Sequence, residues 1–200
     1  MAFIVIGWYG GWWDGFRPGK TVSKSIPKPP APQLQVARTE LTGWDNGSKT
    51  WEIRADRIWQ DNQGDILNFE RISDGVIFSV KERRVDLKAG WARFEKFTNR
   101  LFIGGGITAR IREGTLETPE AVMNFRSGEM LCRQGVSFRG QDAVMQAARI
   151  TVNFEREELH LEGGVELSQN GHSLKAAGVI YNLKTEEYRL IEPRGVTINL

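Results

Sequence analysis

The sequence is poor in cysteine and has almost no excess of charge of either sign. Its 200 residues include one cysteine, Cys132, so no internal disulfide can form. Cys132 lies in an apolar stretch, where a small buried side chain is expected. The 27 basic and 25 acidic residues leave a formal charge of +2, well below the basic excess of a dedicated nucleic-acid-binding domain. The composition excludes a disulfide scaffold and argues against a nucleic-acid partner.

Residues that build common catalytic and metal sites are few or badly placed. The two histidines, His160 and His172, have no second type of metal ligand at a suitable spacing, which argues against a zinc site. Glycines 104–106 lack the Lys-Ser/Thr pair of a phosphate-binding loop and lead into a strand, so a bulge is expected there. We predict no catalytic residue, no metal and no cofactor.

The beginning of the chain lacks a hydrophobic run long enough to cross a bilayer. Residues 1–13 carry no charge and three of the seven tryptophans, a composition typical of a membrane interface. A bilayer core requires about 20 apolar residues, so this stretch is too short to span it. Three interpretations stay open: the end of a transmembrane helix that starts upstream, an interfacial anchor, or an apolar strand. We predict that residues 1–16 are a membrane anchor or its remnant.

Acidic residues are missing from the next segment. Residues 15–39 contain no Asp or Glu, five basic residues and five of the seven prolines. Such a composition favours an extended, solvated chain that acts as a spacer. We predict a Pro/Lys-rich linker over residues 17–33 and one β-domain over residues 34–200.

A repeat of 29–32 residues organises the rest of the chain. After each repeating glycine, apolar residues alternate with polar ones, which predicts a strand with one buried face. A polar turn and a second strand follow, and another apolar strand leads back to the next glycine. We therefore predict about five units, each with two to three strands. The repeating glycines are Gly43, Gly75, Gly106, Gly135, Gly164 and Gly195.

The alternating residues define a candidate inward face on which large and small side chains follow one another. This pairing leaves room between layers, whereas a solid core would favour bulk throughout. Small residues that only let two sheets approach closely would give the same pattern, so both interpretations stay open. Residues 142–150 also fit a helical face, but the next repeat has Gly178 in the equivalent segment, and we predict strands for both. The predicted lining residues are Ile53, Ala55, Val76, Phe78, Ile107, Ala109, Val136, Phe138, Met145, Ala147, Val165, Leu167, Leu174 and Ala176.

Several short motifs recur along the chain: Leu41-x-Gly43, Trp51-x-Ile53-x-Ala55, the later Gly-Val and Leu-x-Ala pairs, and Tyr181-Asn182. Over residues 34–200 these motifs resemble the LptC/LptA/OstA family of lipopolysaccharide-export proteins. The order of apolar segment, linker and β-domain is most similar to membrane-anchored LptC. The resemblance implies an all-β fold, an open V-shaped antiparallel β-jellyroll, with an apolar interior that holds lipid acyl chains and has no enzymatic role.

The resemblance also implies a function and partners. A chain of this family would be tethered to the inner membrane by its N-terminus, and its β-domain would lie in the periplasm. It would receive lipopolysaccharide, or a similar lipid, from an inner-membrane ABC transporter complex and pass it to a downstream LptA-like jellyroll through edge-strand pairing. The last strand ends without a turn, proline or charge, so its edge is the expected partner strand, with Val196, Ile198 and Leu200.

Two other classes of protein remain as alternatives. A repetitive β-solenoid scaffold or adhesin without lipid cargo would show the same periodicity and differ by a filled interior. A β-helix enzyme acting on carbohydrate would need carboxylates stacked at one phase of the repeat. The recurring acids fall at the hairpin turns instead, as Glu82, Glu113 and Asp142 do.

Overall fold

The fold was analysed in a computed structural model that describes residues 34–45, 47–78, 84–111 and 114–197. The predicted anchor and linker, residues 1–16 and 17–33, lie outside the described residues. Within the described ranges all the regular structure is β-strand. No helix in those ranges has the length and apolar character that crossing a membrane requires.

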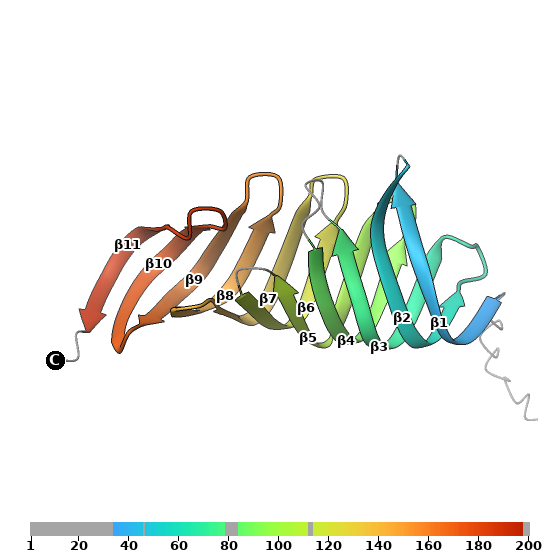
Figure 1. The fold of residues 1–200 in the computed structure, drawn as a ribbon, viewed down its shortest axis with the longest axis horizontal. Coiled ribbons are helices and arrows are strands. Elements are labelled where there is room, and N and C mark those ends of the chain that lie inside the picture. Colours follow the sequence, from blue (N-terminus) through green and yellow to red (C-terminus); the bar gives the residue numbers. More distant parts are fainter. Residues whose placement is uncertain (1–33, 46, 79–83, 112–113, 198–200) are drawn as a thin grey trace, which may run out of the picture. The chain divides into compact units, whose positions relative to one another are not determined.

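Eleven strands make up the described part of the chain. They form one antiparallel sheet in which each strand pairs with its neighbours in the sequence, so β1 and β11 are the two edges (Figure 1). This meander confirms the expected all-β, open antiparallel jellyroll. The strands are β1 (Leu34–Asp45), β2 (Ser48–Gln60), β3 (Ile66–Phe78), β4 (Arg84–Glu95), β5 (Arg100–Ile111), β6 (Gly114–Asn124), β7 (Glu129–Arg139), β8 (Ala143–Asn153), β9 (Glu158–Gln169), β10 (His172–Asn182) and β11 (Tyr188–Thr197).

A bulge near the middle of each inner strand bends it around the interior. Along β7, buried residues alternate with less buried ones up to Cys132 and again from Val136, while the three residues between them are exposed. Gln134 and Gly135 in this gap have φ angles of +69° and +84°, and the register with β8 shifts there. Strands β5 and β9 have comparable interruptions. Both halves of a strand therefore turn an apolar face toward one interior.

The bulges decide how many strands each repeat supplies. The repeat pattern predicts a separate strand before each repeating glycine, but Leu101 and Ile103 lie in the same strand, β5, as Ile107. A bulge bends a strand without ending its ladder of hydrogen bonds, so each repeat supplies two strands rather than two to three. The segment 142–150 lies in strand β8 apart from its first residue, which confirms the prediction of a strand over a helix.

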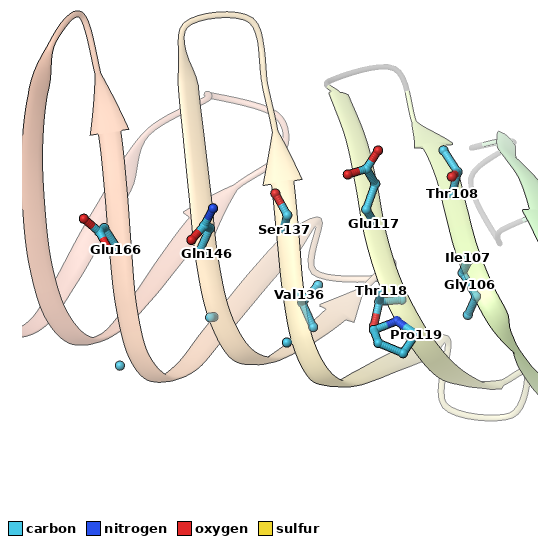
Figure 2. Close-up of a pocket in the computed structure, with 13 residues that line it drawn as sticks. Gly106, Ile107, Thr108, Glu117, Thr118, Pro119, Val136, Ser137, Gln146 and Glu166 are labelled. Atoms are coloured by element: carbon cyan, nitrogen blue, oxygen red, sulfur yellow. The ribbon is translucent and has the colours of Figure 1, made fainter.

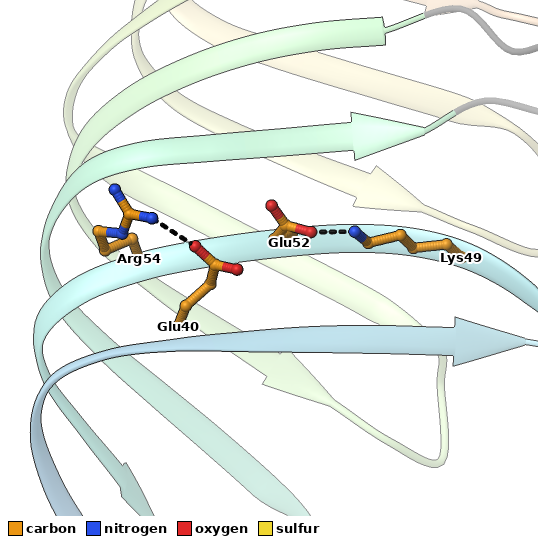
Figure 3. A network of polar contacts seen from close by, with 4 residues as sticks. All are labelled: Glu40, Lys49, Glu52 and Arg54. Atoms are coloured by element: carbon orange, nitrogen blue, oxygen red, sulfur yellow. Dashed lines mark hydrogen bonds and ion pairs between the residues drawn. The ribbon is translucent and has the colours of Figure 1, made fainter.

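Ion pairs on the sheet surface connect neighbouring strands near the β1 edge. Arg54 of β2 donates to Glu40 of β1 at 2.8 Å, and Lys49 pairs with Glu52 within β2 (Figure 3). Exposed pairs of this kind contribute only about 0–1 kcal/mol each. Strand β1 is therefore held mainly by its backbone ladder with β2 and by its inward side chains.

Candidate lipid-binding interior

Most of the predicted lining residues lie in the buried interior between the strand halves. Twelve of the fourteen are buried, and none of these twelve is more than 7% exposed. Phe78 and Leu174 are half-buried. Eleven of the twelve belong to one continuous hydrophobic core, and Val76 is the exception.

In the second repeat the interior residue is Ile77 rather than Val76 or Phe78. Ile77 pairs with Trp51 on β2 and with Val85 on β4, and all three side chains belong to the buried core. Side chains alternate between the two faces of a strand. Val76 and Phe78 therefore face away from the interior, although the repeat pattern placed them on its lining.

The repeating glycines explain this difference because they are not equivalent. Gly106 lies in a bulge with a φ angle of +82°, and the following residue points inward, as in the two later repeats. Gly75 instead occupies an inward position itself, where a Cβ atom would come 2.9 Å from Cγ of Leu87. Gly43 does the same in β1, where a Cβ atom would overlap the indole of Trp51. In the second repeat, the inward positions predicted by counting from the glycine are therefore wrong by one residue.

The other side of the interior is lined by the strand halves before the bulge in odd-numbered strands and after it in even-numbered strands. Sequence reasoning missed these halves as lining residues. Their signal is present as apolar alternation, for example Leu101-x-Ile103, but that alternation was assigned to a separate strand. Among the largest fully buried side chains of these halves are Phe69, Leu101, Ile103, Met123, Ile150 and Leu159.

Cys132 also lies on this second side. It has no exposed surface, and burial raises the pKa of its thiol from 9.0 to about 12. The thiol is therefore neutral near pH 7 and packs as a small apolar side chain, as its apolar sequence context indicates. Within the described ranges no three His, Cys, Asp or Glu side chains gather closely enough to hold a metal ion.

Aromatic rings gather at the end of the interior formed by β2, β3 and β4. The Trp51 ring meets Phe69 edge-on, with 5.6 Å between centroids, and meets Phe94 at 5.2 Å. Phe94 in turn contacts Phe125 at 6.2 Å. The indole N–H of Trp51 is buried and has no hydrogen-bond partner among the described residues, a situation that costs about 1–3 kcal/mol.

A pocket of about 620 Å³ lies beside this aromatic cluster. One wall is apolar and includes Leu41, Trp51 and Phe94. The rim is polar: the Asn99 side-chain amide, in the turn between β4 and β5, donates to a carboxylate oxygen of Asp45 at 2.9 Å. This hydrogen bond joins the end of β1 to the turn between β4 and β5, 54 residues away in the sequence. We call this pocket the mouth.

A second concave surface crosses the outer face of β5 to β9. It has a volume of about 840 Å³, and polar side chains such as Thr108, Glu117 and Glu166 line it together with apolar residues (Figure 2). Thr108 and Ser137 belong to it, while their neighbours Ile107 and Val136 point into the core. Consecutive residues of the same strands therefore lie on opposite faces of the sheet. The apolar residues lie on the inner face and the polar residues on the outer face.

The predicted partner strand is the C-terminal edge of the sheet. Strand β11 pairs with β10, and nine of its ten residues are exposed. The strand begins at Tyr188 and includes Glu192, Pro193 and Arg194, so the expectation of an edge without proline or charge is wrong for its middle part. Val196 is 62% exposed. Ile198 and Leu200 lie outside the described residues.

Comparison with protein families identifies the family of this chain. The family model described as "Lipopolysaccharide-assembly, LptC-related" matches residues 1–168. The chain belongs to this LptC-related family. Membership places it among the non-enzymatic bridge proteins of lipopolysaccharide transport, which are periplasmic. A comparison with curated proteins gives no significant match.

Solved structures show the same fold. One is the crystal structure of LptH from Pseudomonas aeruginosa, described as the LptA-homologous periplasmic component of the conserved lipopolysaccharide transport device. It superposes with a TM-score of 0.53 at 10% sequence identity, covering 61% of this chain and 99% of LptH. At this identity the likeness carries the fold alone, and it agrees with the jellyroll seen in the LptC-related chain.

Proposed function

We propose that the chain binds the acyl chains of lipopolysaccharide, or of a similar lipid, in its interior and passes them along the periplasm. The observation that carries this proposal is the continuous apolar inner face shared by both halves of the bent strands. Acyl chains are transferred favourably from water to such a face, at about 25 cal/mol per Å² of apolar surface buried. The outer face of the same sheet carries polar residues, which are suited to contact with water.

The direction of transfer follows from the two ends of the chain. Residues 1–16 would tether it to the inner membrane next to the ABC transporter complex, with residues 17–33 as the spacer. At the other end, the edge of β11 would pair with the first strand of a downstream LptA-like jellyroll, because an unpaired edge strand can add a further strand through backbone hydrogen bonds. This arrangement would continue the apolar face from one protein to the next.

Photocrosslinking of neighbouring residues tests lipid binding in the interior. A photoreactive side chain would replace Ile107 or Phe138, which face inward, and Thr108 or Ser137 as matched controls on the outer face. We expect capture of lipopolysaccharide at the two inward positions and none at the controls. Thermal melts would identify variants that fold. Equal labelling of inward and outward positions in folded variants would contradict the proposal.

A second candidate is a β-scaffold without lipid cargo. The observation that favours it is the dense packing in the middle of the interior, where Cys132, Ile150 and Leu159 have no exposed surface. The same crosslinking experiment separates the candidates. A folded chain that captures lipid at none of the four positions would favour the scaffold.

Charged substitutions on the two edges test transfer by strand pairing. Val196→Lys on β11 places a charge on the predicted partner edge, and Val36→Lys on β1 is the matched control at 38% exposure. Lysine on an edge strand opposes the addition of another strand. In a pull-down with the LptA-like partner, we expect Val196→Lys to lose most of the binding and Val36→Lys to keep it. Equal binding by both variants would mean that docking uses another surface.

A further inference from the structure

The mouth combines an apolar wall with positively charged side chains. Of the charged residues that line it, two are cations, Lys96 and Arg126, and one is an anion, Asp45. The Asp45 carboxylate already accepts a hydrogen bond from Asn99. The mouth therefore carries an excess of one positive charge next to apolar surface.

Both cations are held in place by backbone carbonyls of nearby turns. The Lys96 ammonium donates to the carbonyl of Gly64 at 2.5 Å, and the Arg126 guanidinium donates to the carbonyl of Phe97 at 2.6 Å. An ammonium has three N–H donors and a guanidinium has five. Each side chain can thus keep its backbone bond and still donate to an anion, while its position costs less conformational entropy when the anion arrives.

The apolar wall is suited to the first part of an acyl chain. Leu41, Leu67 and Phe94 are only partly buried by the rest of the core, so they offer apolar surface that a ligand can cover. Trp51 also lines the mouth, and its indole N–H has no hydrogen-bond partner among the described residues. A ligand with an anionic head and an acyl chain matches both parts of the mouth.

We propose that the mouth is a binding site for a phosphate-bearing amphiphile, with Lys96 and Arg126 holding the phosphate and the acyl chain lying against Trp51 and Phe94. A phosphate monoester fits because it carries a charge of about −1.5 to −2 near pH 7 and three strong acceptor oxygens. This inference rests on the proposed function, because it assigns one end of the same interior to the head of the lipid.

Calorimetric titration of the full chain tests the site with three probes below their aggregation concentrations: dodecyl phosphate, dodecyl maltoside and inorganic phosphate. We expect dodecyl phosphate to bind about tenfold more tightly than dodecyl maltoside, because charge-assisted hydrogen bonds form only with the phosphate. Lys96→Gln combined with Arg126→Gln should remove this preference. The conservative pair Lys96→Arg and Arg126→Lys should keep it.

The matched control removes two positive charges elsewhere on the surface. Arg149 and Lys184 are exposed and do not line the mouth, so Arg149→Gln combined with Lys184→Gln should leave the preference unchanged. Equal binding of both amphiphiles, unaffected by either pair, would overturn the inference and leave the proposed function standing. Inorganic phosphate that binds as tightly as dodecyl phosphate would overturn it as well. If neither amphiphile binds, the inference and the proposed function both fail.

Discussion

The two parts of the interior differ in how completely the protein fills them. In the middle, aliphatic and sulfur-containing side chains such as Cys132, Ile150 and Leu159 have no exposed surface. At the β1 end, Phe94 remains partly exposed, and a pocket of about 620 Å³ lies beside its ring and Trp51. The same repeat thus builds a dense region and an open region within one apolar face.

The difference follows from side-chain shape and from position in the sheet. Small and branched side chains interdigitate between the two strand halves and reach the density of an ordinary core. Aromatic rings prefer edge-on and tilted contacts, as Trp51 makes with Phe69 and Phe94, and these contacts leave gaps near an edge strand. In the described part of the interior the mouth offers a ligand preformed space, whereas the middle would have to open to accept an acyl chain.

Truncating one ring in each region should give the largest effect. Phe138 has no exposed surface and packs 5.8 Å from the Tyr181 ring, so Phe138→Ala should lower the free energy of unfolding by about 3–5 kcal/mol. Phe94→Ala should cost only about 1–2 kcal/mol, since this ring is partly exposed already. Urea unfolding followed by circular dichroism measures both values. Equal costs would show that the β1 end is packed as tightly as the middle.

Replacing each of two neighbouring glycines by alanine compares the stability cost of a side chain at two positions in one bend. Gly105 and Gly106 both have positive φ angles, near +80°, which cost an alanine about 1–2 kcal/mol. A Cβ atom on Gly105 would also come 3.0 Å from Cα of Gly90, whereas a Cβ atom on Gly106 would meet open space. Gly105→Ala should therefore destabilise by about 2–3 kcal/mol and Gly106→Ala by about 1–2 kcal/mol. Thermal melts would show the order, and the reverse order would contradict the close approach of β4 and β5.

The Cys132 thiol provides a smaller, pH-dependent test of the dense region. Its pKa is raised from 9.0 to about 12, so the folded chain holds the proton more tightly than the unfolded chain does. The stabilisation from the neutral thiol is complete below pH 9 and is lost as the pH rises toward 12. Relative to Cys132→Ala, the wild type should lose on the order of 1 kcal/mol between pH 8 and pH 10 in urea titrations. A constant difference between the two proteins would mean that the thiol is not buried.

The 29–32-residue period and the alternation within it were sufficient to predict an antiparallel all-β sheet, because they are local signals, whereas the jellyroll was implied by the family resemblance. It also located most of one side of the interior, for instance Ile107 and Phe138, since period two fixes which residues share a face. It could not show that Gly75 occupies an inward position while Gly106 forms a bulge, because both conformations are open to glycine. Nor could it bring Asp45 beside Asn99, a contact that depends on how the bent strands place their turns.

The most direct test of lipid binding is whether the chain carries lipid when it is isolated from cells. The full chain would be extracted in mild detergent and examined by native mass spectrometry, with Phe138→Ala and the Lys96→Gln, Arg126→Gln pair measured alongside. We expect a species whose added mass corresponds to an acylated lipid. The signal of this species should be weaker in the variant with the two substitutions at the mouth. An extract containing only the bare chain, with no uptake of purified lipopolysaccharide on addition, would contradict the assignment of the interior to lipid.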